Sequence, residues 1–129
     1  MFGCPSGSNC KVGLKSYHNK FVAAEGKANA NRDKLDLWEI FSVIFIGGDK
    51  VQLKGHFGKY LVAENDGSVN ANRDVGDLWE TWTVEAKGSG LAFKSHHGKY
   101  LVAEPNGELN ANRDVADLWE IFRVVHSTT

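Results

Sequence analysis

The sequence has no excess of charge of either sign and no long hydrophobic run. Fifteen Lys and Arg residues stand against sixteen Asp and Glu residues, which gives a formal net charge of -1. Because no global positive field would attract phosphate backbones, we expect no nucleic-acid partner. The longest apolar run extends only from Val43 to Ile46, far short of the roughly 20 residues of a membrane helix. We therefore expect no membrane span.

Cysteine is scarce, since Cys4 and Cys10 are the only two in the chain. Both lie in a Gly/Ser-rich lead-in, residues 1–11, and no further cysteine exists to complete a four-ligand thiolate site. A local disulfide that clamps the terminus and a pair of reduced thiols both fit this spacing. The lead-in does not resemble a secretory signal, so we expect a cytoplasmic location. Reducing compartments favour thiols, and we predict the reduced form.

The common catalytic signatures are also missing. The sequence contains no glycine-rich phosphate loop, no HExxH pair and no nucleophile elbow. Glu39, Glu80 and Glu120 recur, but three equivalent carboxylates without a shared cleft do not make the differentiated acid and base pair of hydrolysis. We predict a protein that is not an enzyme and has neither a metal site nor a cofactor.

What the sequence does contain is one unit repeated three times. The second unit is VQLKGHFGKYLVAENDGSVNANRDVGDLWETWTV, and the third, LAFKSHHGKYLVAEPNGELNANRDVADLWEIFRV, follows it at a constant offset of 40 residues. The first is VGLKSYHNKFVAAEGKANANRDKLDLWEIFSV, which is two residues shorter between Glu25 and Asn29. We predict a single domain over residues 12–129, with repeats at about 12–46, 51–86 and 90–126.

Apolar residues inside each unit follow a period of two, which indicates β-strands rather than helices. Turns separate these segments, and we predict a left-handed residue three times in the first turn, at Asn19, Gly58 and Gly98. Each unit then has four short strands, the last of them running through the DLWE segment. A short helix capped by Asp117 is the alternative there.

Twelve short strands in three equal units cannot bury their apolar faces separately. Closing them around a threefold axis removes the sheet edges and pools the apolar side chains. We therefore predict an all-β protein, a β-trefoil with three pseudo-symmetric four-stranded repeats. The predicted core consists of four layers: Leu14, Leu53 and Phe93; Val22, Leu61 and Leu101; Phe41, Trp82 and Phe122; and Val43, Val84 and Val124.

The pattern LKSHHGKYLVAE, a turn, NANRD, DLWE and F-x-V resembles the fascin repeat and, more distantly, hisactophilin. Both are β-trefoils grouped with actin-crosslinking proteins, and the likeness covers the chain after Lys11. The resemblance implies a β-trefoil that associates with actin. Fascin joins four trefoils and bundles filaments through several of them, whereas this chain holds one, so binding is implied more than bundling. The histidine content and the lack of an acylation signal separate the chain from the membrane behaviour of hisactophilin.

The first candidate site is a set of Lys and His residues in the first hairpin turn of each unit. Its members are Lys15, His18, Lys20, Lys54, His56, Lys59, Lys94, His96, His97 and Lys99. A basic rim with imidazoles suits an acidic partner such as an actin filament, and its charge grows as pH falls. Solvated turn charges are the structural alternative. We expect a monomer that binds through this rim.

The second candidate site combines the NANRD segments with the tryptophans that follow them. Its members are Asn31, Asp33, Trp38, Asn72, Asp74, Trp79, Asn112, Asp114 and Trp119. Asn and Asp can bind sugar hydroxyls, and Trp can stack on the apolar face of a pyranose. The same residues can instead stabilise turns and cover the barrel. A lectin with up to three equivalent sites is therefore the alternative function.

The glutamates of the DLWE segments need partners because alternation points them toward the barrel. Two kinds of partner are open, and we predict that one of them holds each carboxylate. One is backbone N–H, and the other is the arginine of the NANRD segment, Arg32, Arg73 or Arg113.

Overall fold

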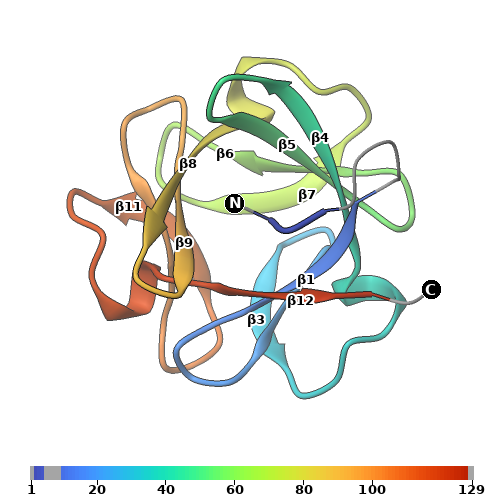
Figure 1. Cartoon of the computed structure of the whole chain (residues 1–129). Helices are drawn as coiled ribbons and strands as arrows, with labels where there is room; N and C mark the ends of the chain where they lie inside the picture. Colours follow the sequence, from blue (N-terminus) through green and yellow to red (C-terminus); the bar gives the residue numbers. More distant parts are fainter. Residues whose placement is uncertain (1, 5–9, 128–129) are drawn as a thin grey trace.

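The computed structural model describes residues 2–4 and 10–127, and among them six strands form a barrel. These are β1 (Lys11–Lys15), β4 (Phe41–Gly47), β5 (Lys50–Gly55), β8 (Thr81–Lys87), β9 (Gly90–Lys94) and β12 (Arg123–His126). Neighbouring strands pair antiparallel around the ring in Figure 1. The ring closes between β9 and β12, where Leu91 and Phe122 exchange two backbone hydrogen bonds of 2.8 Å.

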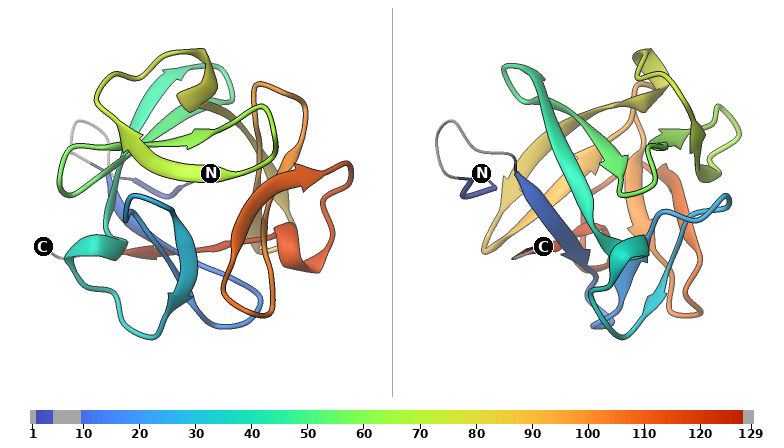
Figure 2. Two further views of the ribbon diagram at one scale, coloured as in Figure 1. Left: turned by 180° about the vertical axis from the view of Figure 1, so that it is seen from behind. Right: turned by 90° about the vertical axis from the view of Figure 1, so that its right-hand side faces the viewer.

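The other six described strands form three hairpins that cover one end of the barrel. They are β2 (Phe21–Ala23) with β3 (Asn29–Arg32), β6 (Tyr60–Ala63) with β7 (Val69–Arg73), and β10 (Tyr100–Ala103) with β11 (Leu109–Arg113). The side view in Figure 2 places these hairpins away from both chain ends. Repeat 1 comprises β1–β4, repeat 2 comprises β5–β8 and repeat 3 comprises β9–β12. The predicted β-trefoil is confirmed.

The barrel interior holds the predicted core. All residues of the first three predicted layers are buried, as are Val43 and Val84, whereas Val124 is only partly buried. Trp82 is the largest of these side chains, and its indole N–H donates to the Leu61 carbonyl at 3.2 Å. The three predicted left-handed turn residues are also confirmed, with φ of 62° at Asn19, 89° at Gly58 and 80° at Gly98.

Each hairpin is tied to the hairpin of the next repeat by backbone hydrogen bonds, and one of these recurs at all three junctions. The carbonyl of a turn glycine accepts from the N–H of an alanine in the neighbouring hairpin. The pairs are Gly26 with Ala71 (2.9 Å), Gly67 with Ala111 (2.8 Å) and Gly107 with Ala30 (2.8 Å). Since the third pair returns to repeat 1, the hairpins form a closed ring about the pseudo-threefold axis, visible from behind in Figure 2.

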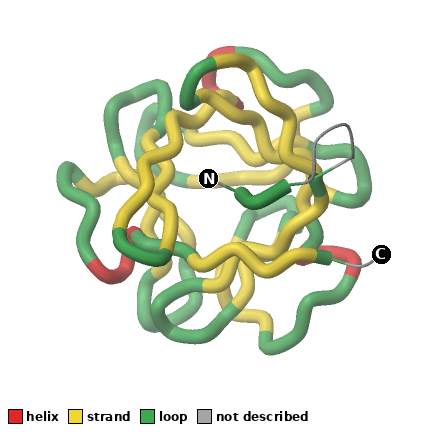
Figure 3. The backbone as a smooth tube through the Cα atoms, viewed as in Figure 1, coloured by secondary structure: helices red, strands yellow, loops and turns green. Residues whose placement is uncertain are grey.

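The DLWE segments differ from the predicted strands. Each forms a single 3-10 turn: η1 (Leu37–Glu39), η2 (Leu78–Glu80) and η3 (Leu118–Glu120), drawn in red in Figure 3. Asp117 is the N-cap of η3 and accepts from the Leu118 N–H, so the helical alternative describes the segment better, although the helix is only one turn long. The strand prediction failed because an Asp and a Glu three residues apart form a capping box, which stabilises a helical start.

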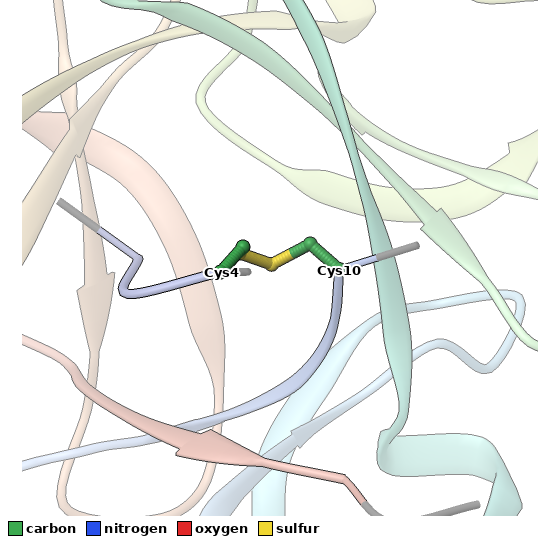
Figure 4. The surroundings of a disulfide bond; sticks show 2 residues. All are labelled: Cys4 and Cys10. Atoms are coloured by element: carbon green, nitrogen blue, oxygen red, sulfur yellow. A yellow bond between two sulfur atoms is a disulfide. The ribbon is translucent and has the colours of Figure 1, made fainter. Parts of the chain in front are cut away.

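The lead-in differs more strongly, and the prediction of reduced thiols was wrong. Cys4 and Cys10 form a disulfide, with their Cα atoms 5.4 Å apart (Figure 4). Phe2 is 4% exposed and packs against the rings of Phe45 and Phe93, with centroid distances of 5.9 and 6.1 Å. Because Phe2 is buried at the barrel end opposite the hairpins, Cys4 lies close enough to Cys10 to form the disulfide. Residues 5–9 of the lead-in lie outside the described residues.

The ring of hairpins predicts that Gly107→Ala destabilises the protein. An added Cβ would lie 2.6 Å from the Asn31 Cβ, and Gly107 has a φ of 93°. We expect the free energy of unfolding to fall by about 1 to 3 kcal/mol, measured by urea denaturation. Gly26→Ala is the matched control, since no atom lies within 4 Å of its added Cβ. Equal losses in the two variants would contradict the prediction.

Candidate functional site

The structure brings the two predicted sets together at three junctions between repeats. At each junction the tryptophan of one repeat contacts a ring in the first hairpin turn of the next repeat. The pairs are Trp38 with Phe57 (ring centroids 4.3 Å apart), Trp79 with His97 (4.7 Å) and Trp119 with His18 (5.3 Å). The Lys/His set and the Asn/Asp/Trp set therefore form one lateral surface, repeated three times.

Ion pairs join the two sets within each repeat. The pairs are Lys20 with Asp33, Lys59 with Asp74, and Lys99 with Asp114. The hydrogen bond and the charge of the lysine hold the pKa of Asp33 and of Asp114 below their usual range. The carboxylates are 75 to 77% exposed, so each pair contributes little to stability. Each of these aspartates nevertheless already has a lysine ammonium group as its partner.

A second lysine in each repeat, on the strand before the first hairpin turn, lies over an aromatic ring. The ammonium groups of Lys15, Lys54 and Lys94 lie 5.3 to 5.5 Å from ring centroids of Phe21, Tyr60 and Tyr100. Such cation–π contacts position a cation without neutralising it. Within the described part of the chain these three lysines make no ion pair, so their charges remain available to a partner.

The four histidines of the Lys/His set divide into two groups. His18 donates through Nε2 to the Ala103 carbonyl at 3.1 Å, and His97 donates to the Ala63 carbonyl at 3.0 Å. Nε2 carries the proton in both cases because a carbonyl oxygen only accepts. These two imidazoles link neighbouring repeats. His56 and His96 instead lie exposed at the turn ends, where they can meet a partner.

The NANRD motif is largely explained by contacts inside each hairpin. In repeat 2, Glu64 accepts from Asn70 at 2.9 Å and from Arg73 at 2.8 Å, while Ala71 is buried between them. Glu25 and Glu104 hold the corresponding residues of repeats 1 and 3. Sequence reasoning missed these three glutamates. The signal in the sequence was that every repeat has a Glu at the end of one strand and NANRD on the following strand.

The buried glutamates of the DLWE segments have backbone partners. Glu39, Glu80 and Glu120 accept from the N–H of the aspartate three residues earlier, at 2.9, 2.7 and 2.6 Å. Arg32 also forms an ion pair with Glu39, at 3.9 Å. Among the described residues the backbone partner is therefore confirmed for all three glutamates and the arginine partner for Glu39 alone, because Arg73 and Arg113 pair with Glu64 and Glu104.

Open hollows border the tryptophan turns. One of about 370 Å³ is lined by Arg113, Asp117, Leu118, Trp119 and Glu120. One of about 420 Å³ is lined by the equivalent residues of repeat 2. The Asp and Glu side chains of these hollows cap the 3-10 turns, and the arginines bind the strand glutamates, although one guanidinium nitrogen of Arg113 is buried without a hydrogen-bond partner. The third junction has a hollow of different composition, lined by Trp38 and Phe57 among others.

The described residues contain no cluster of three or more His, Cys, Asp or Glu side chains that could hold a metal ion. None of the described helices has the length and apolar character needed to cross a bilayer.

The capping arrangement predicts that Glu80→Ala lowers stability. The Glu80 side chain is 5% exposed, so its removal leaves the Asp77 N–H without its acceptor. We expect a loss of about 1.5 to 3 kcal/mol in the free energy of unfolding, measured by thermal or urea denaturation. Glu80→Gln keeps an acceptor oxygen and should lose less than half as much. Unchanged melting of Glu80→Ala would refute this role.

Comparison with known proteins agrees with this architecture. The model of the Fascin domain family matches residues 12–124, which span all three repeats. Comparison with curated proteins gives no match. The matched segment begins in β1 and ends in β12, so it includes residues from all six barrel strands and all three hairpins. The chain belongs to the fascin domain family.

Proposed function

We propose that this chain is a non-enzymatic binding module that associates with actin filaments through the Lys/His hairpins of its lateral surface. The fascin domain match over residues 12–124 carries the proposal, because the family is one of actin-bundling proteins. The basic hairpins are chemically suited to an acidic protein surface.

The lysines over aromatic rings are the strongest candidates for the contact. Lys15, Lys54 and Lys94 are held in place by cation–π contacts and make no ion pair within the described residues. Lys20, Lys59 and Lys99 each face an aspartate, so their field is partly cancelled. Among the histidines, His56 and His96 are exposed while His18 and His97 are bound to backbone carbonyls. Contact through Lys15, Lys54, Lys94, His56 and His96 is therefore the specific form of the proposal.

We also propose that the protein acts as a monomer in the cytoplasm, where filaments are found. The Cys4–Cys10 disulfide would meet thiol reductants in that compartment.

The lectin with three equivalent sites has less support. Its aspartates are already paired with lysines, and the hollow beside Trp38 differs in lining from those beside Trp79 and Trp119, which does not favour three equivalent sites.

Filament co-sedimentation tests which lysines bind. Replacing Lys15, Lys54 and Lys94 together by Gln should weaken filament binding about tenfold, since each lost contact is worth roughly 0.5 kcal/mol. Replacing Lys20, Lys59 and Lys99 by Gln is the matched control and should weaken binding by less than about threefold. Absence of the unaltered protein from the filament pellet would end the actin proposal.

The exposed histidines predict a pH dependence. Imidazoles gain positive charge as pH falls from 7.5 to 6.0, and a cation at the interface strengthens binding to an acidic surface. We expect several-fold tighter pelleting at pH 6.0. Replacing His56 and His96 together by Gln should reduce this difference while leaving binding at pH 7.5 unchanged. A difference of the same size in the double variant would assign the pH effect to other groups.

A further inference from the structure

One of the three junctions departs from the threefold pattern, and several departures coincide there. Repeat 1 is two residues shorter in its second turn, which is reduced to Gly26 and Lys27. Repeat 2 has Gly55 where repeats 1 and 3 have Ser16 and Ser95. It also has Phe57 where the others have a carbonyl-bound histidine. Gly26, Gly55 and Phe57 all line the same hollow.

The change from histidine to Phe57 removes a hydrogen bond between repeats. At the other two junctions an imidazole Nε2 donates to the carbonyl of Ala63 or Ala103. Ala24 is the equivalent residue of repeat 1, and a phenyl ring has no donor to offer it. Phe57 instead packs on Trp38, with the ring planes 39° apart. Ala24 lines the hollow beside these rings.

The hollow has the size and lining of a small-ligand site. Its volume is about 380 Å³, and ligand pockets start at roughly 300 Å³. Its small residues, Ala24, Gly26, Gly55 and Ala71, leave the space open. Trp38 and Phe57 are 42 and 52% exposed, so an apolar face laid against them would remove aromatic surface from water.

The rim supplies hydrogen-bonding groups without net charge. Asn72 lines the hollow, and its Oδ1 accepts from Arg73 at 2.6 Å. Within the described part of the chain the Asn72 side-chain N–H groups have no partner, so they can donate to a ligand. Lys59 also lines the hollow and is paired with Asp74. The pair offers a donor beside an acceptor, and its two charges cancel.

We propose that this hollow is a single binding site for a pyranose ring of a neutral carbohydrate. A pyranose combines an apolar face, which matches Trp38 and Phe57, with hydroxyl groups that both donate and accept. A purely apolar ligand would leave the amide of Asn72 unsatisfied on binding. An anion would gain less from Lys59 than from an unpaired lysine, because Asp74 partly cancels its charge. The site is distinct from the lysines assigned to the filament, Lys15, Lys54 and Lys94.

Titration by two-dimensional NMR tests the site. The probes are the methyl glycosides of glucose, galactose, mannose and N-acetylglucosamine, each added to the full chain. We expect at least one to shift the indole signal of Trp38 and the side-chain amide signal of Asn72, with a dissociation constant of about 1 to 10 mM. The indole signals of Trp79 and Trp119 should remain in place.

Substitutions separate this site from the other junctions. Trp38→Ala should weaken glycoside binding by at least about tenfold, whereas the matched Trp79→Ala should leave it unchanged. Phe57→His restores the pattern of the other two junctions and should also abolish binding. Its ability to fold is checked by its melting temperature and by the unchanged Trp82 indole signal.

Three results would overturn the proposal. The first is the absence of any shift with all four glycosides at 100 mM, a concentration about tenfold above the weakest affinity expected. The second is an equal shift at Trp38, Trp79 and Trp119, which would indicate three equivalent sites. The third is a stronger response to N-acetyltyrosine amide than to any glycoside, which would assign the hollow to a protein side chain.

Discussion

The backbone hydrogen bond between each turn glycine and an alanine of the next repeat is the contact on which the arrangement of the hairpins depends. Gly26, Gly67 and Gly107 supply the carbonyls, and the ring they form has no free end. The barrel has the same property, since β12 of repeat 3 pairs with β1 of repeat 1, and the Leu91–Phe122 hydrogen bonds join the two outer strands of repeat 3. No repeat satisfies its own polar groups or buries its own core, so the three must fold together.

This dependence explains why so much of the repeated sequence is structural. The strand glutamate, the first asparagine and the arginine of NANRD hold one another, as Glu64, Asn70 and Arg73 do in repeat 2. The Glu of each DLWE segment caps its own turn. A contact needed once in each repeat produces three copies of its residues, whether or not they bind anything. Exact repetition is therefore weak evidence of a ligand site, and departures from it are more informative.

Sequence alone predicted the features that depend on local pattern. Alternation identified the buried positions. Asn19 occupies the repeat position at which the other two units have glycine, and this predicted its positive φ. It failed where two local preferences compete, as in the DLWE segments, where the capping box prevails over strand alternation. It also could not show that His18 meets Trp119, because they are about a hundred residues apart in sequence and join only when the ring closes. The disulfide was missed for a similar reason, since Phe2 had to be placed in the barrel end first.

The geometry of the lateral surface lets the two proposed partners coexist on one molecule. Cations and exposed turns recur at all three junctions, whereas the hollow lined by Trp38 and Phe57 has its particular composition at one. A carbohydrate in that hollow would lie against the Lys/His turn of repeat 2, which contains Gly55 and Phe57, and would leave the Lys/His turns of repeats 1 and 3 uncovered. Coupling between the partners is reciprocal by linkage, so the filament would weaken sugar binding by the same factor as the sugar weakens filament binding. The factor by which each partner weakens the other cannot exceed the part of the filament affinity that comes from repeat 2. In a threefold arrangement, repeat 2 supplies only one of the three Lys/His turns.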